Sequence, residues 1–390
     1  MRHELQVELL RQLLDQLDRG VNIDAGGLRK NPTDAYTCTE RAEREWQAFF
    51  RQHPQCIGLS GELPGPGSFV TLNDFGTEVL ATRDNDGVFR AFLNSCRHRG
   101  AMLEAERRGN RSRFTCPFHA WTYRADGVLA GIPMREHFGD IDTGCHGLIE
   151  LPAVEDRGFL WVHPDPNGRI DPGELLTGLQ DDLDSWNWGQ LTLASETTYD
   201  MHLNWKLAAD TFGETYHFKR LHKDTLAGMF HGDVLAYDTF GRNHRMILCS
   251  RQIDNYRELP ESDWRINVGG FPVYYLFPNV ILNVGPAGLT LVRVYPVPGE
   301  TGRSISRLGF YFYPEMLAAD PDMLRFRAEA FGTVVQSEDY ATGESIQRAA
   351  ESGLLDYVIY GRNEAPLHHY HNTYRAALGM APLPLLDAVE

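Results

Sequence analysis

Long apolar runs are absent from this chain of 390 residues. No stretch approaches the roughly 18 apolar residues that a membrane-spanning helix requires. The N-terminus, Met1-Arg-His-Glu-Leu5, also lacks the apolar core of a signal peptide. Basic residues are outnumbered, with 37 Lys and Arg against 53 Asp and Glu and a formal net charge of −16. We therefore expect no membrane span and no binding to nucleic acids or to anionic membranes.

Cysteine is scarce, with 6 residues in the chain. Four of them show no paired spacing, and we interpret these as inert packing residues: Cys38, Cys56, Cys145 and Cys249. The absence of a disulfide framework is typical of a protein of the reducing cytoplasm. A nucleotide signature is missing too, because no G-x-G-x-x-G follows a predicted strand. No flavin or nicotinamide site is therefore expected in this chain.

Two short motifs pair thiols with imidazoles: Cys96-x-His98 and, after 17 intervening residues, Cys116-x-x-His119. Two Cys and two His suit a [2Fe–2S] cluster in which one iron takes both Cys and the other takes both His. Neutral imidazoles leave such a cluster less negative than an all-Cys cluster, so its potential lies at about −150 to +300 mV. A structural zinc site is the alternative, although zinc motifs usually group two Cys ahead of two His.

A second motif lies in residues 204–222, which we predict to be mostly helical. Steps of three and four residues place Asp210, Glu214 and His217 on one helix face. His222 would lie about 140° around an ideal helix from His217, so the two imidazoles meet only if the helix ends or is distorted between them. Two His and one carboxylate form the ligand face of mononuclear Fe(II) oxygenases.

The two motifs together resemble the alpha subunits of the Rieske non-heme iron oxygenases, also called ring-hydroxylating oxygenases. The resemblance rests on Asn94–Ala101, Cys116–Tyr123, Asn204–His222 and Gln336–Arg348. It implies that Cys96 and Cys116 hold one iron of the cluster, and that His98 and His119 hold the other. It also implies that His217, His222 and a distant carboxylate bind Fe(II). Asp339 maps onto this third ligand, with the neighbouring Glu338 as its competitor.

The same resemblance gives roles to two further acids and one unusual alanine. Glu214 stands where relatives have a carboxylate, usually Asp, that bridges to a Rieske His of the neighbouring subunit and conducts the electron. His119 is its expected partner. Asp210 is expected to support the iron ligands, whereas His368, His369 and His371 are interpreted as structural. Ala120 occupies a position where the family usually has Gly.

The pattern of strands and helices predicts one domain inserted into another. Residues 56–163 show short strands separated by Gly, Pro and Asn-Asp signals. Residues 194–203 and 268–313 alternate like strands, whereas 204–230 and 318–350 are predicted to be helical. Separate blocks of strands and helices imply an α+β fold. We predict an all-β Rieske domain at 50–165, inserted into an α+β, helix-grip-like catalytic domain formed by 1–49 and 166–390.

The resemblance implies the terminal oxygenase of a Rieske system, supplied with electrons by a separate reductase, directly or through a ferredoxin. It would hydroxylate or oxidatively demethylate a small organic, preferably aromatic, substrate with O2. A quaternary ammonium substrate such as a betaine or carnitine is the alternative; an electron carrier or a zinc-stapled binding protein is more remote. A head-to-tail homotrimer without a β subunit is expected. Arg242, Arg245 and Arg251 are expected to face solvent.

Overall fold

The computed structural model of the protein describes residues 1–386. The chain forms two compact units. The outer unit comprises Met1–Ala48, Gly173–Trp186 and Leu193–Glu390, and the inserted unit comprises Phe49–Pro172 and Asn187–Thr192. The last four residues of the predicted range 166–390 lie outside the described part. No helix within residues 1–386 is long and apolar enough to cross a membrane.

The inserted unit is built almost entirely from short strands. One sheet has five strands in the order β10-β5-β4-β3-β6, and two smaller sheets have the orders β11-β12-β2 and β7-β8-β9. The strands are β2 Gln55–Leu59, β3 Ser68–Leu72, β4 Val79–Arg83, β5 Phe89–Leu93, β6 Arg108–Asn110, β7 Arg113–Thr115, β8 Thr122–Arg124, β9 Leu129–Gly131, β10 Glu150–Leu151, β11 Ala153–Asp156 and β12 Phe159–Val162. The prediction of an all-β inserted domain is confirmed.

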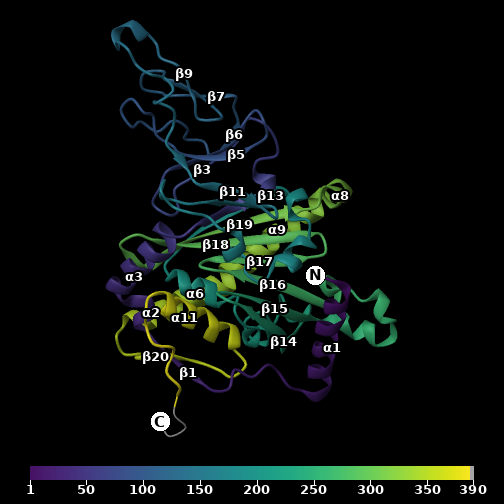
Figure 1. Cartoon of the computed structure of the whole chain (residues 1–390). Coiled ribbons are helices and arrows are strands. Elements are labelled where there is room, and N and C mark those ends of the chain that lie inside the picture. Colours follow the sequence, from purple (N-terminus) through teal and green to yellow (C-terminus); the bar gives the residue numbers. More distant parts are fainter. Residues whose placement is uncertain (387–390) are drawn as a thin grey trace. The chain divides into compact units, whose positions relative to one another are not determined.

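A seven-stranded sheet forms the centre of the outer unit, in the order β13-β19-β18-β17-β16-β15-β14. From β14 to β19 each neighbouring pair is antiparallel, and Figure 1 shows the strands in this order. The strands are β13 Thr192–Met201, β14 Phe230–Phe240, β15 Asn243–Ser250, β16 Gly270–Leu276, β17 Val280–Gly285, β18 Gly288–Val297 and β19 Glu300–Phe312. A small separate sheet pairs β1 Arg29–Pro32 with β20 Tyr357–Tyr360.

Helices accompany this sheet, as expected for an α+β fold. The α-helices are α1 His3–Arg19, α2 Asp34–Thr37, α3 Thr39–Glu45, α4 Pro172–Leu175, α5 Gln180–Asp184, α6 Trp205–Asp210, α7 Ile266–Gly269, α8 Pro314–Ala319, α9 Pro321–Val334, α10 Ala341–Glu351 and α11 Ala365–Ala377. The 3-10 segments are η2 Ser60–Glu62, η3 Arg135–His137, η4 Trp188–Gln190, η5 Tyr216–Lys219, η6 Arg251–Glu258 and η7 Glu261–Asp263. The π-helical segments are η1 Trp46–Arg51 and η8 Val335–Tyr340.

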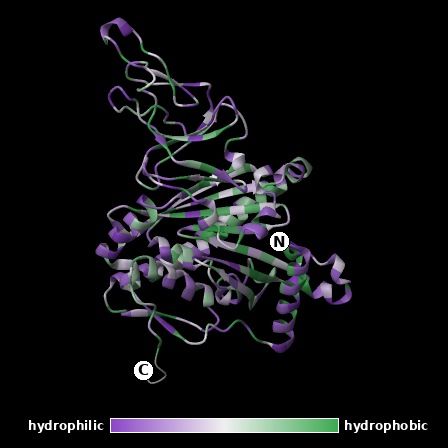
Figure 2. Ribbon diagram, viewed as in Figure 1, coloured by the Kyte–Doolittle hydropathy of each residue, from purple (hydrophilic) through white to green (hydrophobic). Residues whose placement is uncertain are grey.

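The two faces of the large sheet contact different helices. Ile247 and Cys249 of β15 pack in one core cluster with Leu10 and Leu13 of α1. His244 of β15 points the other way and touches α11, because side chains alternate along a strand. The strands of the sheet are mostly apolar in Figure 2. We call the second face the α11 face, and it is the face that matters for the site.

The predicted helix over 204–230 is wrong. Helix α6 ends at Asp210, a short 3-10 turn covers Tyr216–Lys219, and turns lead on to β14. Thr211 donates its hydroxyl to the carbonyl of Ala208 over 2.9 Å, which competes with regular helix hydrogen bonds. Gly213 follows, and glycine costs about 1 kcal/mol in a helix interior. The helix therefore ends before Glu214 and His217.

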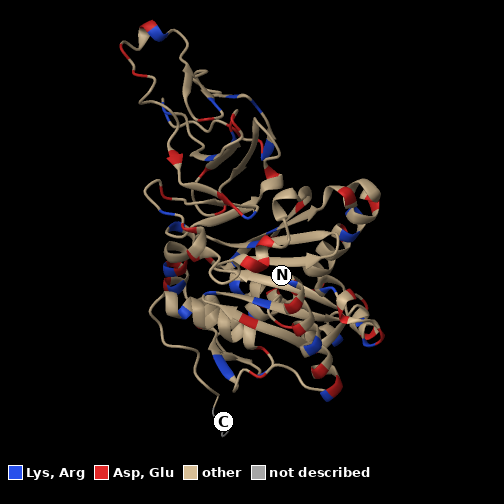
Figure 3. Ribbon diagram, turned by 45° about the vertical axis from the view of Figure 1, so that its right-hand side comes forward, with Lys and Arg blue, Asp and Glu red and all other residues tan. Residues whose placement is uncertain are grey.

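Two further predictions about single residues are also wrong. Arg245 is buried instead of solvent-exposed, and it pairs with Asp182 and with Asp238, the latter at 2.5 Å. Cys145 is exposed instead of packed, whereas Cys56 and Cys249 are buried, and none of the six cysteines, all within residues 1–386, forms a disulfide. Figure 3 shows acidic and basic residues spread over both units.

Candidate metal centres

The two Cys-His motifs form two matching loops in the inserted unit. The backbone N–H of Cys96 donates to Ala101 O over 2.8 Å, and Gly100 donates back to Cys96 O over 2.9 Å. The second loop repeats this pattern: Cys116 donates to Trp121 O over 2.8 Å, and Ala120 donates to Cys116 O over 2.9 Å. Both cysteines are buried. Each loop thus encloses its cysteine with the same pair of backbone hydrogen bonds.

Ala120 is the structural counterpart of Gly100. Gly100 has φ +76°, and Ala120 has φ +59°, in the left-handed region that glycine adopts at little cost. A Cβ in this region costs about 1–2 kcal/mol. The alanine is therefore accommodated with strain, which explains why glycine would suit this position better.

The side chains of the two loops converge. Burial raises the pKa of the Cys96 thiol, which also contacts Tyr123 and Cys116. The rings of His98 and His119 lie 4.7 Å apart between centroids, and Trp121 stacks on His98 at 5.2 Å. Two adjacent thiols beside two adjacent imidazoles are the donor set of a Rieske cluster.

The second site lies in the outer unit, where three ligand atoms converge. His217 Nε2 and His222 Nε2 are 3.1 Å apart, and Asp339 Oδ1 lies 3.4 Å from the first and 3.2 Å from the second. Three ligands at about 2.1 Å from one metal and at right angles to each other would be about 3 Å apart. The residues therefore fit one face of an octahedral metal. The break in the helix after Asp210 is what lets the two imidazoles meet.

A π-helical turn, η8, carries the third member of this set. It places the adjacent residues Glu338 and Asp339 on the same site in different roles. Asp339 faces both Nε2 atoms, whereas Glu338 Oε2 lies 2.6 Å from His222 Nδ1 and 3.0 Å from the hydroxyl of Thr225. The sequence suggested Glu338 only as a competing ligand. The spacing of the motif gave no signal for its contact with the far side of the His222 ring.

Glu214 holds the other imidazole in the same way. One carboxylate oxygen contacts His217 Nδ1, and the other accepts the backbone N–H groups of Tyr216 and His217, the latter over 3.2 Å. Each histidine of the site therefore has a carboxylate on the nitrogen that points away from the metal position. Such contacts orient the ring and set its tautomer.

The electrostatics of the ligand face favour a positive charge. Burial lowers the pKa of His217, but hydrogen bonds to Asp339 and Glu214 outweigh it and raise the pKa to about 9. Burial raises the pKa of Asp339, but the two imidazoles outweigh burial and hold it below its usual value. A cation, either a proton or a metal ion, is therefore stabilised here, and metal binding must displace protons.

Comparisons with known proteins identify the segments that carry the two groups of side chains. Residues 53–147 match the Rieske [2Fe-2S] domain, and residues 188–380 match the catalytic domain of the ring hydroxylating alpha subunit. The chain belongs to the Rieske oxygenase alpha-subunit family. It is therefore a Rieske non-heme iron oxygenase that takes a Rieske [2Fe–2S] cluster and Fe(II). Rieske oxygenases form oligomers and use a separate reductase.

Individual relatives cover most of the chain. The carnitine monooxygenase oxygenase subunit of Acinetobacter baumannii is 26% identical over 82% of this chain and 85% of its own length. Its Escherichia coli counterpart is 25% identical over 88% and 94%. A crystal structure of a quaternary ammonium Rieske monooxygenase is 25% identical, covers 90% of this chain and 94% of its own, and has a TM-score of 0.77.

Asp210 does not lie with the iron ligands, contrary to the expectation for this Rieske oxygenase. Its carboxylate accepts hydrogen bonds from the hydroxyls of Tyr36 and Tyr360 over 2.9 and 3.1 Å, and it lies 2.9 Å from His371 Nε2. The helix that was to carry Asp210 and His217 on one face ends between them. His371 is buried, and its pairing with Asp210 was missed because 161 residues separate the two.

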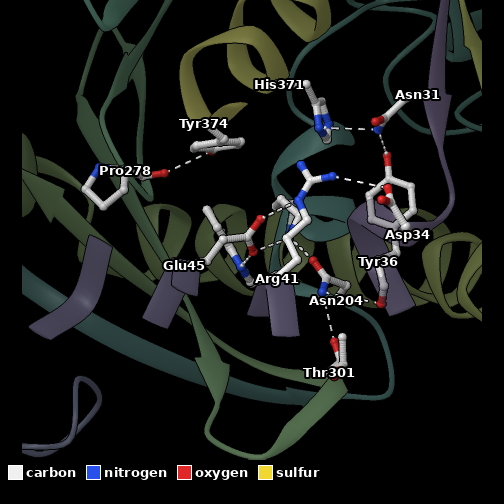
Figure 4. Close-up of polar contacts among 12 residues, drawn as sticks. Asn31, Asp34, Tyr36, Arg41, Glu45, Asn204, Pro278, Thr301, His371 and Tyr374 are labelled. Carbon is white, nitrogen blue, oxygen red and sulfur yellow. Dashed lines mark hydrogen bonds and ion pairs between the residues drawn. The ribbon is translucent and has the colours of Figure 1, made fainter. Parts of the chain in front are cut away.

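Helix α6 is held at its first turn by a second buried group of polar residues (Figure 4). Asn204 caps the helix by accepting the N–H of Lys206 over 3.0 Å and donates to Thr301 O over 2.9 Å. The buried ammonium of Lys206 contacts Glu45 of α3, which also accepts Arg41 Nε over 3.0 Å. Contacts at both ends of α6 thus position the loop that leads to Glu214 and His217.

Proposed function

We propose that Cys96, Cys116, His98 and His119 hold the Rieske cluster and that His217, His222 and Asp339 hold Fe(II). The convergence of three ligand atoms within 4.8 Å of one another supports the iron site most directly. When bound, the cluster supplies single electrons and the iron activates O2. Metal analysis of the loaded protein tests this assignment, with about three irons and two acid-labile sulfides expected per chain. Zinc in place of iron would overturn it.

We further propose that Glu214 connects the two centres across subunits. Its carboxylate already contacts His217 Nδ1, and a carboxylate offers about four acceptor sites. Acceptor capacity therefore remains for His119 of the partner subunit. This role requires a head-to-tail ring, and we propose a homotrimer without a β subunit in the reducing cytoplasm. In each subunit, residues 50–165 would form the Rieske domain, and residues 1–49 and 166–390 would form the catalytic domain. Sedimentation of the loaded protein tests the subunit number.

A single-turnover measurement tests the bridge itself. With O2 and substrate, the reduced cluster of the wild-type protein should reoxidise as product forms. Glu214→Gln retains the size of the side chain and is loaded with excess Fe(II) until metal analysis finds both centres filled; reoxidation of its cluster should then still slow strongly. Glu329→Gln, the same change on the exposed surface of α9, is the matched control. Equal reoxidation rates in wild type and Glu214→Gln would remove Glu214 from the electron path.

The proposed substrate is a small quaternary ammonium compound. Relatives named for carnitine, glycine betaine and choline support this choice, as does the net charge of −16, which attracts cations. A row of aromatic rings also begins at the iron site. The distances between ring centroids are 5.4 Å from His222 to Phe218, 5.9 Å from Phe218 to Phe230 and 5.5 Å from Phe230 to Phe271. Aromatic rings attract quaternary ammonium groups.

Asn283 provides a polar group beside this row. Strand pairing places Asn283 opposite Val273, and a Cβ on Gly285, two residues further, would lie 3.6 Å from the ring of Phe271. Asn283 and Phe271 are therefore near neighbours on the α11 face. Within residues 1–386, the buried Nδ2 of Asn283 has no hydrogen-bond partner. We propose that it donates to a carboxylate or hydroxyl at the other end of the substrate.

Oxygen uptake with a surrogate reductase tests the substrate class. L-carnitine, glycine betaine and choline should each be compared with anthranilate, measuring coupled uptake and product. Phe271→Leu should raise the KM for the cation by about 2- to 30-fold, the cost of one cation–π contact. Phe326→Leu, which removes an exposed ring elsewhere, should leave the KM unchanged. Coupled uptake with anthranilate alone would overturn the proposal.

An aromatic acid is the second candidate. The large subunit of anthranilate 1,2-dioxygenase from Acinetobacter baylyi is 30% identical over 53% of this chain. The aromatic row could stack on a planar ring, and Asn283 could receive its carboxylate. The uptake comparison separates the two candidates.

A further inference from the structure

A buried cluster of five polar side chains lies at the end of α6, and the proposed oxygenation does not use it. We call it the Asp210 cluster: Asn31, Tyr36, Asp210, Tyr360 and His371 (Figure 4 shows Asn31, Tyr36 and His371). Asn31 donates its amide to the hydroxyls of Tyr36 and Tyr360 over 2.9 and 3.0 Å. These five residues come from β1, α2, α6, β20 and α11, so five elements of the outer unit meet at the cluster.

The two phenols of this cluster are placed for proton transfer. Their oxygens lie 2.6 Å apart, and both face Asp210 Oδ2, at 2.9 Å from Tyr36 and 3.1 Å from Tyr360. Burial and the charge of Asp210 raise the pKa of both hydroxyls, so both phenols are neutral. A neutral phenol loses an electron far more readily when a base takes its proton at the same time. Asp210 is such a base.

A row of rings connects this cluster with the loop that carries Glu214 and His217. A Cβ on Gly213, the residue before Glu214, would lie 2.7 Å from the ring of Tyr370, so this ring lies directly against the loop. Measured between ring centroids, Tyr374 lies 6.5 Å from Tyr370, and His371 lies 5.9 Å from Tyr374. From His371, the rings of Tyr36 and Tyr360 are 6.0 and 5.3 Å away. Electrons hop readily between rings at such separations.

We propose that Tyr36 and Tyr360 form a redox-active pair that removes oxidising equivalents left at the iron site when no substrate is oxidised. The oxidant is a peroxide, the product of reducing O2 by two electrons without substrate turnover. Each phenol O–H bond breaks in turn: its proton leaves by way of Asp210, and its electron goes to the peroxide. The two electrons and two protons released in this way convert one hydrogen peroxide into two molecules of water and leave both phenols as phenoxyl radicals. Two electrons delivered by the reductase, together with two protons from the solvent, then restore both phenols.

Freeze-quench electron paramagnetic resonance tests the pair in the loaded, substrate-free enzyme after addition of hydrogen peroxide. The wild-type protein should give a tyrosyl radical, and Y36F and Y360F should lose most of that signal. D210N keeps both phenols but removes the base, so its signal should fall as well. Y256F is the matched control, because Tyr256 is a buried tyrosine bonded to Arg265 O in another part of the unit. Circular dichroism identifies any variant that does not fold.

A second measurement makes the pair testable without iron chemistry. The inference rests on the proposed iron site as the place where peroxide reacts, so the full chain is also prepared with redox-inert Zn(II) at that site and oxidised by azide radicals. The radical should settle on the same pair and be lost in Y36F and Y360F. Metal analysis reports separately on a failure of the proposed iron ligands. Signals that are absent from the wild type, or equal in wild type and Y36F, Y360F and D210N, overturn the proposal. A signal in the zinc protein without one after peroxide overturns it too, because the pair then takes no part in reactions at the iron.

Discussion

The two Cys-His loops and the proposed iron site hold their side chains by different means. In the loops, each cysteine is enclosed by two backbone hydrogen bonds, and the pattern around Cys96 is repeated around Cys116. At the iron site, side chains do the same work: Glu214 holds His217, and Glu338 holds His222. The ligands of each loop lie within four residues, whereas Asp339 is 117 residues from His222, by subtraction of their positions.

This difference has a consequence for how each site responds to change. A site held by its own backbone depends on few side chains other than its ligands, so most substitutions nearby should leave it intact. A site held by side chains from distant segments depends on each of these contacts. The expected effects below therefore decrease from the iron ligands to the cluster loops.

The largest effect is expected for Asp339→Ala. Loss of one of three ligands should remove the mononuclear iron, so product formation should fall to background and metal analysis should fall from about three irons per chain to about two. The visible spectrum of the Rieske cluster should not change, because its loops are held separately. Asp322→Ala on the exposed surface of α9 is the control. Full turnover by Asp339→Ala would exclude this residue as a ligand.

A smaller effect is expected for Glu338→Gln, which leaves all three ligands in place. His222 would lose the carboxylate on Nδ1, and such contacts are worth about 10- to 100-fold in metal affinity or activity. Fe(II) affinity, measured by competition with a chelator, should fall within this range, and Glu329→Gln should not change it. If both variants bind iron alike, the contact of Glu338 with His222 has no role in holding the metal.

Acid should weaken the outer unit through a buried imidazole. Burial, helped by the neighbouring His369, lowers the pKa of His244 well below its usual value, so the folded state keeps it neutral. The unfolded chain binds a proton below pH about 6.5, so stability is complete above that pH and falls as the pH decreases, by at most about 1.4 kcal/mol per unit. Denaturant unfolding of the wild type and His244→Gln, from pH 7.5 to 5, measures this slope. The variant should show a flatter dependence, and parallel curves would refute the assignment.

The smallest effect is expected in a cluster loop. Ala120→Gly should relieve the left-handed strain, partly offset by the greater freedom of glycine in the unfolded chain, for a net gain of about 0.5–1 kcal/mol in unfolding free energy. Ala130→Gly, in the exposed part of β9, should instead lose about 0.5–1 kcal/mol. Thermal unfolding of the loaded protein distinguishes the two. A lower melting temperature for Ala120→Gly would show that the alanine methyl contributes more than its strain costs.

The sequence predicted what is local. The Cys96 and Cys116 motifs and the short strands of residues 56–163 could be read from the sequence, because neighbours in sequence determine them. The helix through 204–230 could not be excluded, because Gly213 packs against Leu367 and Tyr370 of α11, which lies far away in the chain. The partners of Asp210 and the burial of Arg245 were equally inaccessible, since they depend on segments far away in the chain.

The wide turn Val335–Tyr340 makes the identity of the proposed carboxylate ligand sensitive to a single inserted or deleted codon. Removing one residue there would turn the neighbouring acids by about 100° relative to α9 and exchange or abolish their roles. When distant homologues are aligned, a gap misplaced by one position would therefore name the wrong acid. Superposition of the turn, rather than column matching, is the safer basis for transferring the ligand between proteins.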